Sequence, residues 1–173
     1  MSRLSAQDPA LGRLISRVGP FGLEPPAKAS VFAAVTRSIA YQQLTGKAAA
    51  TIFGRMEALY GGARAFTPDA VLATPDLALR QAGLSGAKVA AVKDLAAKCA
   101  DGTVPDWRGL RRLDDEAVVE RLTRVRGVGR WTAEMILIFR LGRPDVLPLG
   151  DYGVRKGFAL TFRTRGLPTA PQL

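Results

Sequence analysis

The chain has 173 residues, 47% of them hydrophobic, so it can bury the core of a folded domain. It contains one cysteine, Cys99, and no histidine, which excludes an internal disulfide, a histidine-based triad and a multi-cysteine zinc or iron–sulfur site. The formal charge of +10 is spread along the chain and either favours a polyanionic partner or reflects an arginine-rich coding bias.

Apolar residues recur at helical spacing nearly throughout, and the strict alternation of half-buried strands is absent. The sequence therefore predicts an all-α fold, as a single domain over residues 1–173. Helices are expected, in chain order, over 9–18, 30–41 with Ser30 as the cap, 45–59, two short segments that open at Thr67-Pro68 and Thr74-Pro75 with threonine as cap and proline at the first helical position, 86–99, 114–125, 129–141 and 151–162.

Neither a membrane span nor a signal peptide is predicted. No apolar run is long enough to cross a bilayer, and residues 1–10 lack the basic start and apolar stretch of a signal peptide. We expect no membrane association and a cytoplasmic, nucleoid-associated location.

A turn between two predicted helices has the sequence Arg126-Gly127-Val128-Gly129-Arg130. Glycine permits positive φ angles and close approach of a ligand to the backbone. The amides that follow such a turn are helix N-terminal donors, which suit a phosphate oxygen. An ordinary helical hairpin with glycine at its bend explains the same pattern.

A lone acidic residue, Asp151, opens a helix after the proline-containing apolar segment 144–150. Aspartate is a good N-cap, and this role alone would account for it. The helix dipole and amides at that position also keep a carboxylate ionised, as a base or cation-stabilising group must be.

Taken together, segment 122–157 resembles the helix-hairpin-helix, Gly/Pro-rich loop and aspartate signature of the HhH-GPD superfamily of base-excision DNA glycosylases. Segment 41–49, Tyr-Gln-Gln-Leu-Thr-Gly-Lys-Ala-Ala, resembles the part that the 3-methyladenine DNA glycosylase II branch places at the DNA. The similarity runs from about residue 8 to the end. It implies a helical bundle of two small lobes with the active site in the cleft between them.

The resemblance assigns a catalytic role to Asp151 and a base pocket to Trp131, Tyr152 and Met135. Trp131 falls where lyase-competent relatives have a catalytic lysine, which implies a monofunctional enzyme without AP-lyase activity. Lys156 lies about 140° around the helix from Asp151, so it is a poor nucleophile. The implied reaction flips an alkylated purine out of duplex DNA and hydrolyses its N-glycosidic bond.

The resemblance also assigns DNA contacts. Gln43 would fill the space left by the flipped base, with Gln42 beside it. The backbone amides of the hairpin would bind a phosphate and its carbonyls a structural Na⁺ or K⁺. No other cofactor and no iron–sulfur cluster is implied, and a monomer acting on double-stranded DNA with alkylated bases is expected. The amide donors are Gly127, Gly129 and Thr132, and the carbonyl ligands are Thr123, Val125 and Val128.

Each assignment has a simpler alternative. Trp131 and Met135 are four residues apart on an apolar helix and could belong to the core. Tyr152 could be a half-buried aromatic residue, and Gln42-Gln43 a solvated helix end. At the level of function, the alternatives are a non-catalytic helix-hairpin-helix DNA-binding module and a helical protein-interaction domain.

Residues 166–173 look like the opening of a further helix. Relatives usually continue with a final helical segment that packs on the bundle, so we expect the chain to be truncated relative to them. Without that segment, the apolar faces of helices 129–141 and 151–162 would be exposed.

Overall fold

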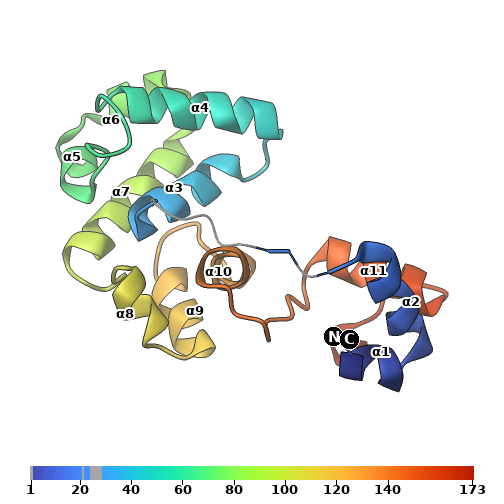
Figure 1. The fold of residues 1–173 in the computed structure, drawn as a ribbon. Helices are drawn as coiled ribbons and strands as arrows, with labels where there is room; N and C mark the ends of the chain where they lie inside the picture. The colour runs from blue at the N-terminus through green and yellow to red at the C-terminus, as the bar shows by residue number, and fades with distance from the viewer. Residues whose placement is uncertain (1, 21, 24–28) are drawn as a thin grey trace. The chain divides into compact units, whose positions relative to one another are not determined.

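The computed structural model describes residues 2–20, 22–23 and 29–173, and its regular elements in these ranges are all helical (Figure 1). The predicted all-α fold is therefore confirmed. No helix in this part of the chain is long and apolar enough to cross a membrane. The elements are α1 (Ser2–Gln7), α2 (Pro9–Val18), α3 (Val31–Tyr41), α4 (Gly46–Ala58), α5 (Pro68–Ala73), α6 (Asp76–Gln81), α7 (Gly86–Ala100), α8 (Trp107–Arg111), α9 (Asp115–Thr123), α10 (Arg130–Ile136), the π-helical turn η1 (Leu137–Leu141), α11 (Tyr152–Phe162) and the 3-10 turn η2 (Ala170–Gln172).

The chain divides into two compact units. Unit 1 combines Met1–Glu24 with Leu147–Leu173, and unit 2 is the continuous segment Pro25–Val146. This division agrees with the two lobes implied by the resemblance. That residues 1–173 act as one domain stays a prediction.

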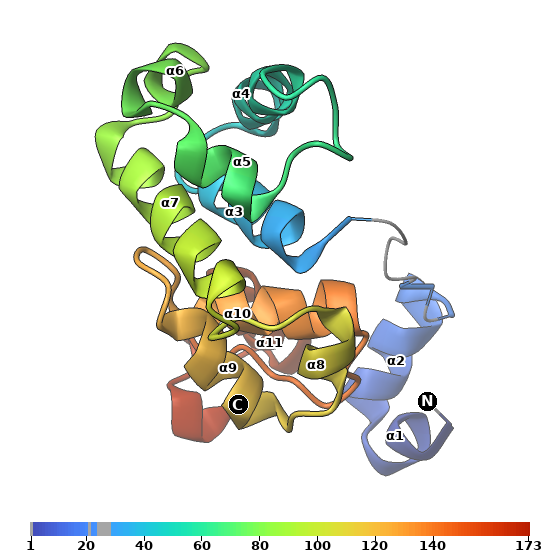
Figure 2. The ribbon, with the colours of Figure 1, turned by 90° about the vertical axis from the view of Figure 1, so that its left-hand side faces the viewer.

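Unit 2 is built around α7, which packs against α3 and α5 and runs beside both in Figure 2. Its hydrophobic core is continuous and receives side chains from every helix of the unit, including Met56 of α4 and Leu110 of α8. Fully buried members include Val35, Val92, Leu95, Leu110 and Leu122. Burial of apolar surface at this scale is the main stabilising term for such a unit.

Unit 1 has much less of a core. Helix α2 packs against α1 and α11, yet neither α2 nor α11 contains a buried residue. Local interactions define its helices: the Asp8 carboxylate caps α2 by accepting from the amides of Ala10 and Leu11, at 2.7 and 2.9 Å. Phe158 and Phe162 stack at 4.4 Å between ring centroids along α11.

The capping predictions had mixed outcomes. Ser30 caps α3 as expected, and Thr67 caps α5 with proline at the first helical position. The Thr74-Pro75 prediction is wrong, because Thr74 ends α5 and Pro75 is the N-cap of α6. The Thr74 hydroxyl instead donates to the Ala70 carbonyl at 2.7 Å within α5 and lies 2.9 Å from the Tyr60 hydroxyl, and Thr74 itself ends α5.

Three further differences concern helix extents. Helix α1 and the five-residue α8 were not predicted, because both are too short to show a hydrophobic period. The helix expected over 129–141 is α-helical only as far as Ile136 and continues as the π-helical turn η1. Gly142 then ends it in the left-handed conformation, at φ 69°.

Candidate functional site

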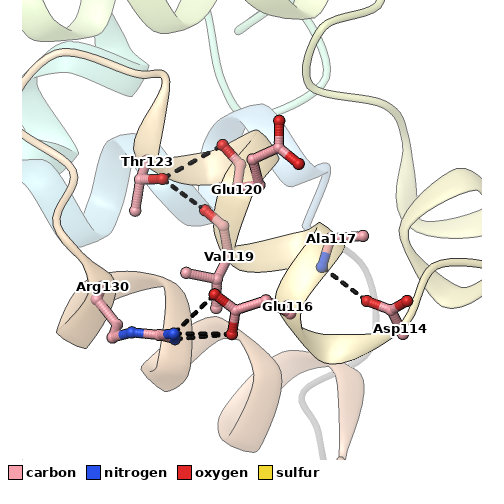
Figure 3. A network of polar contacts seen from close by, with 7 residues as sticks. All are labelled: Asp114, Glu116, Ala117, Val119, Glu120, Thr123 and Arg130. Carbon is pink, nitrogen blue, oxygen red and sulfur yellow. Dashed lines mark hydrogen bonds and ion pairs between the residues drawn. The ribbon is translucent and has the colours of Figure 1, made fainter.

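The glycine turn joins α9 to α10 as a helix-hairpin-helix. Asp114 caps α9 by accepting from the Ala117 amide at 2.7 Å, and Arg130 at the start of α10 forms a bidentate ion pair with Glu116 of α9 (Figure 3). Gly127 has φ 74°, and a Cβ there would lie 3.6 Å from the Ala91 methyl group of α7. Because L-residues rarely adopt this conformation, the turn depends on glycine.

The N-terminus of α10 has no side-chain cap. Its N-cap is Gly129, whereas α9 has Asp114 and α7 has Ser85. Within the part of the chain that the structure describes, the amides of Gly127 and Gly129 have no protein acceptor, and Thr132 lies in the first turn of α10. First-turn amides lack intrahelical partners, so these donors are available to a ligand oxygen.

The hairpin and segment 41–49 are joined by a hydrogen bond. The Gln42 side-chain amide donates to the Gly127 carbonyl at 2.9 Å, across 85 residues of sequence. Segment 41–49 and the hairpin therefore lie together in unit 2, and Gln42 is not simply a solvated helix end. Gln43 has φ 57°, a left-handed conformation that is uncommon for a residue with a side chain.

A surface hollow of about 570 Å³ opens where these motifs meet. Trp131 is 49% exposed and Met135 partly buried, so neither belongs to the core of unit 2. Sequence reasoning did not identify three of the residues here, which lie on the last turns of α3. The hollow is lined by the predicted residues Gln42, Gln43, Gly127, Trp131, Thr132 and Met135, and by the additional residues Arg37, Ser38 and Tyr41.

Helix α7 positions both motifs. The Lys88 ammonium donates to the carbonyls of Ala40 and Gln42, at 2.9 and 2.8 Å, at the end of α3. The Asp94 carboxylate accepts from the Arg126 amide at 2.7 Å in the hairpin and pairs with Lys98. Burial lowers the pKa of Lys88. Burial also acts to raise the pKa of Asp94, but the bonds from Lys98 and Arg126 outweigh it and hold that pKa below its ordinary value.

Asp151 lies in unit 1 as the N-cap of α11. Its Oδ1 atom accepts from the Val154 amide at 2.8 Å, and its own amide donates to the Pro148 carbonyl at 2.9 Å. A Cβ at Gly153 would come within 3.0 Å of that Oδ1 atom, so glycine leaves room for the carboxylate. The capping role expected from the sequence is therefore present.

Tyr152 follows Asp151 and is 63% exposed rather than half-buried. The Lys156 ammonium lies 5.9 Å from the centroid of its ring, so one face of the ring already has a cation nearby.

The carbonyls of Thr123, Val125 and Val128 lie at the end of α9 and in the turn. The Val125 carbonyl also accepts from the Val128 amide at 3.0 Å. Among the described residues no cluster of His, Cys, Asp and Glu side chains could hold a metal ion, so a cation here would depend on backbone oxygens. The Na⁺ or K⁺ site stays a prediction.

Comparison with known proteins identifies the family. Residues 36–173, most of the chain, match the family described as HhH-GPD superfamily base excision DNA repair protein. The chain belongs to this superfamily. The matched region of this HhH-GPD protein includes segment 41–49, the hairpin and Asp151.

Relatives of the HhH-GPD protein also match over most of its length. DNA-3-methyladenine glycosylase 1 of Schizosaccharomyces pombe is 34% identical over 96% of this chain and 73% of its own. DNA-3-methyladenine glycosylase of Saccharomyces cerevisiae is 31% identical over 74% of this chain and 45% of its own. The resemblance to the 3-methyladenine glycosylase branch is therefore confirmed.

Solved structures of 3-methyladenine glycosylases also match this chain. The S. pombe 3-methyladenine DNA glycosylase in complex with abasic DNA superposes with a TM-score of 0.82 at 33% identity, covering 97% of this chain and 82% of that one. A DNA-3-methyladenine glycosidase from Bacillus halodurans gives a TM-score of 0.83 at 38% identity, over 92% and 71% of the two chains. The fold class of the HhH-GPD protein is thus that of a helix-hairpin-helix glycosylase.

Proposed function

We propose that this chain is a monofunctional DNA glycosylase that removes alkylated purines of the 3-methyladenine type from double-stranded DNA. The observation that carries the proposal is the Gln42–Gly127 hydrogen bond, which brings segment 41–49 and the hairpin to one hollow. The names of the relatives in S. pombe and S. cerevisiae support the reaction class.

The hairpin binds the DNA backbone in this proposal. Amides of Gly127, Gly129 and Thr132 donate to a phosphate oxygen, and the net charge of +10 strengthens attraction to the duplex. These contacts are independent of base sequence, as a repair protein that searches for damage requires. A monovalent cation on the carbonyls of Thr123, Val125 and Val128 would reinforce the same phosphate contact.

The hollow receives the extruded base. Flipping a nucleotide costs a few kcal/mol of stacking and pairing, and less for a damaged base. Gln43 fills the space left in the stack, and its left-handed backbone fits a residue held in a special conformation for function. The exposed Trp131 face attracts a purine made cationic by alkylation, by roughly 0.5–2 kcal/mol.

Asp151 supplies the chemistry. As the glycosidic bond breaks, the sugar becomes oxocarbenium-like, and a carboxylate stabilises this charge and orients or deprotonates the attacking water. An alkylated purine already carries positive charge, so it leaves without a general acid, consistent with a chain that has no histidine. Trp131 replaces the lysine of lyase-competent relatives, so strand cleavage is not expected.

The remaining expectations complete the proposal. The enzyme needs no redox or organic cofactor, acts as a monomer and works in the cytoplasm at the nucleoid. Each of these follows from the resemblance and the composition of the chain.

The test is single-turnover release of bases from methylated duplex DNA, with Asp151→Asn as the active-site variant. Asparagine is an equally good N-cap, so the fold of unit 1 is retained. We expect binding to persist and excision to fall by roughly 10²–10³-fold, as for loss of one transition-state electrostatic contact. A matched control is Asp114→Asn, which changes a capping aspartate with the same geometry at α9.

Near wild-type release by Asp151→Asn would reject the aspartate assignment. Salt-sensitive binding without any base release by the wild-type chain would instead favour a non-catalytic DNA-binding module. Strand cleavage accompanying base release would contradict the monofunctional assignment.

A further inference from the structure

Arg37 and Tyr41 form a side-chain pair on the last two turns of α3. The Arg37 Nη2 atom donates to the Tyr41 hydroxyl at 2.9 Å, and its guanidinium carbon lies 4.1 Å from the centroid of the Tyr41 ring. Residues four apart on a helix are neighbours, so α3 itself sets this geometry. Both side chains line the hollow that contains Gln42, Gln43 and Trp131.

No carboxylate of the described residues lies within ion-pair distance of the Arg37 guanidinium. A second arginine, Arg140 of η1, lines an adjoining hollow with Arg37. Burial, and then the charge of Arg37, lowers the pKa of Arg140. Glu57 and Asp106 also line this adjoining hollow, but among the described residues neither guanidinium forms an ion pair with a carboxylate.

The Arg37–Tyr41 pair still has hydrogen-bond donors without a protein acceptor among the described residues. The Tyr41 oxygen accepts from Arg37, and its own hydroxyl proton has no protein acceptor in the parts of the chain that the structure describes. The end of a helix normally repels an anion, because its last carbonyls carry negative partial charge. Here the Lys88 ammonium binds the carbonyls of Ala40 and Gln42, which removes this obstacle.

A guanidinium and a hydroxyl on one side of a hollow match an oxyanion and not a cationic purine. Arginine presents a planar fork of donors that suits phosphate oxygens, and charge-assisted bonds are the strong ones. A cationic base entering beside an uncompensated guanidinium would be repelled. A phosphate on that guanidinium would cancel the repulsion.

We propose that Arg37 and Tyr41 together bind one phosphate of the DNA strand that enters the hollow, separately from the phosphate bound by the hairpin amides. This inference rests on the proposed function, since it assumes that the hollow receives DNA. It adds a backbone contact that neutralises the arginine next to the base site.

The experiment measures binding of the full chain to a duplex with an uncharged abasic-site analogue, at a series of KCl concentrations. The variant Arg37→Gln should reduce the slope of log affinity against log salt by about 0.9, the contribution of one phosphate contact. Between 50 and 200 mM KCl the wild type should therefore lose roughly 3.5-fold more affinity than the variant. Arg37→Lys keeps the charge and should keep most of the slope.

Methylphosphonate substitution then locates the phosphate. One uncharged position near the abasic site should weaken the wild type and leave Arg37→Gln unaffected. Tyr41→Phe should retain the salt slope and lose roughly 2- to 10-fold in affinity, because only a hydrogen bond is removed. Thermal melting confirms that each variant is folded.

The matched control is Arg108→Gln, an exposed arginine on α8 that lines neither hollow. An unchanged slope in Arg37→Gln, or an equal reduction in Arg108→Gln, would overturn the inference. Base release by the wild type is measured on methylated DNA in parallel. Its absence would count against the proposed function, whereas the salt slope is read without any excision.

Discussion

The two units of the molecule are organised differently. Unit 2 contains the continuous hydrophobic core, and the hairpin and Gln42 are fixed to it through α7. Unit 1 contains Asp151, yet its helices α2 and α11 have no buried residue. The residues proposed to bind DNA thus lie on a packed scaffold, while the proposed catalytic carboxylate caps a helix that has no buried residue.

This difference indicates how stability is distributed. Regions with few buried contacts open at lower free energy than regions with a dense core, even within one chain. Unit 1 should therefore exchange its backbone amides faster than unit 2. The mutations below are expected to separate the two units, and they are ordered by the size of their effects.

The largest contrast comes from truncating one leucine in each unit. Leu122→Ala empties a fully buried position on α9 and should lower the free energy of unfolding by about 2–5 kcal/mol. Leu160→Ala truncates a side chain that is 72% exposed on α11 and should change the free energy of unfolding by less than about 0.5 kcal/mol. Chemical denaturation of the full chain measures both, and equal losses would contradict the difference between the units.

Next is the cap of α11. Asp151→Ala removes the acceptor for the Val154 amide and should destabilise the helix by about 1 kcal/mol, whereas Asp151→Asn should not. Hydrogen exchange of the α11 backbone amides measures this loss of helix stability. Equal exchange in the two variants would mean that unit 1 is held by something other than this cap.

Asp94→Asn should weaken the attachment of the hairpin by about 1 kcal/mol at neutral pH, because a charged acceptor for the Arg126 amide is lost. The folded pKa of Asp94 lies below its ordinary value, so its contribution is complete above about pH 4 and disappears as the pH falls further. The difference between wild type and variant should therefore shrink in acid. The control is Asp76→Asn, because the Asp76 side chain is 69% exposed and pairs with Lys93 at the surface. This variant should differ less from the wild type in free energy of unfolding at neutral pH.

The smallest effect on stability is expected at Gln43. Glycine relieves the left-handed backbone but costs chain entropy, so Gln43→Gly should leave stability unchanged or raise it by up to about 1 kcal/mol. Excision should nevertheless fall, because the side chain that fills the stack is gone. Gln43→Ala also removes the side chain but introduces no glycine, so comparing the two variants separates the loss of the side chain from the change in backbone freedom. Full activity in both variants would reject the proposal that Gln43 fills the space left by the flipped base.

Local signals in the sequence predicted most of the fold. Ser30 and Thr67 cap helices because a hydroxyl followed by free amides is a short-range pattern. The five residues of α8 complete too few turns for periodicity to reveal them. At Thr74 the error arose because one hydroxyl can bond backward to a carbonyl as well as forward to an amide.

The site was predictable where a motif is contiguous and not where it is assembled by folding. Gln42, Gly127 and Asp151 lie within recognisable segments. Lys88 and Asp94 act on residues 46–48 and 32 positions away, and nothing in their neighbourhood indicates these partners. Arg37 was overlooked because an arginine on an amphipathic helix resembles any solvated charge until its surroundings are known.

Unit 1 is made from the two ends of the chain, with α2 packed against α11. During translation, segment Pro25–Val146 is complete before α11 leaves the ribosome, and domains generally fold as units as they emerge. Helix α2 can then pack against α11, which lies about 140 residues downstream, only after α11 has been synthesised. Contacts between such distant segments form slowly. A nascent chain should therefore form the hairpin before Asp151 has a helix to cap, so under the proposed function the DNA-binding residues are in place before the catalytic carboxylate.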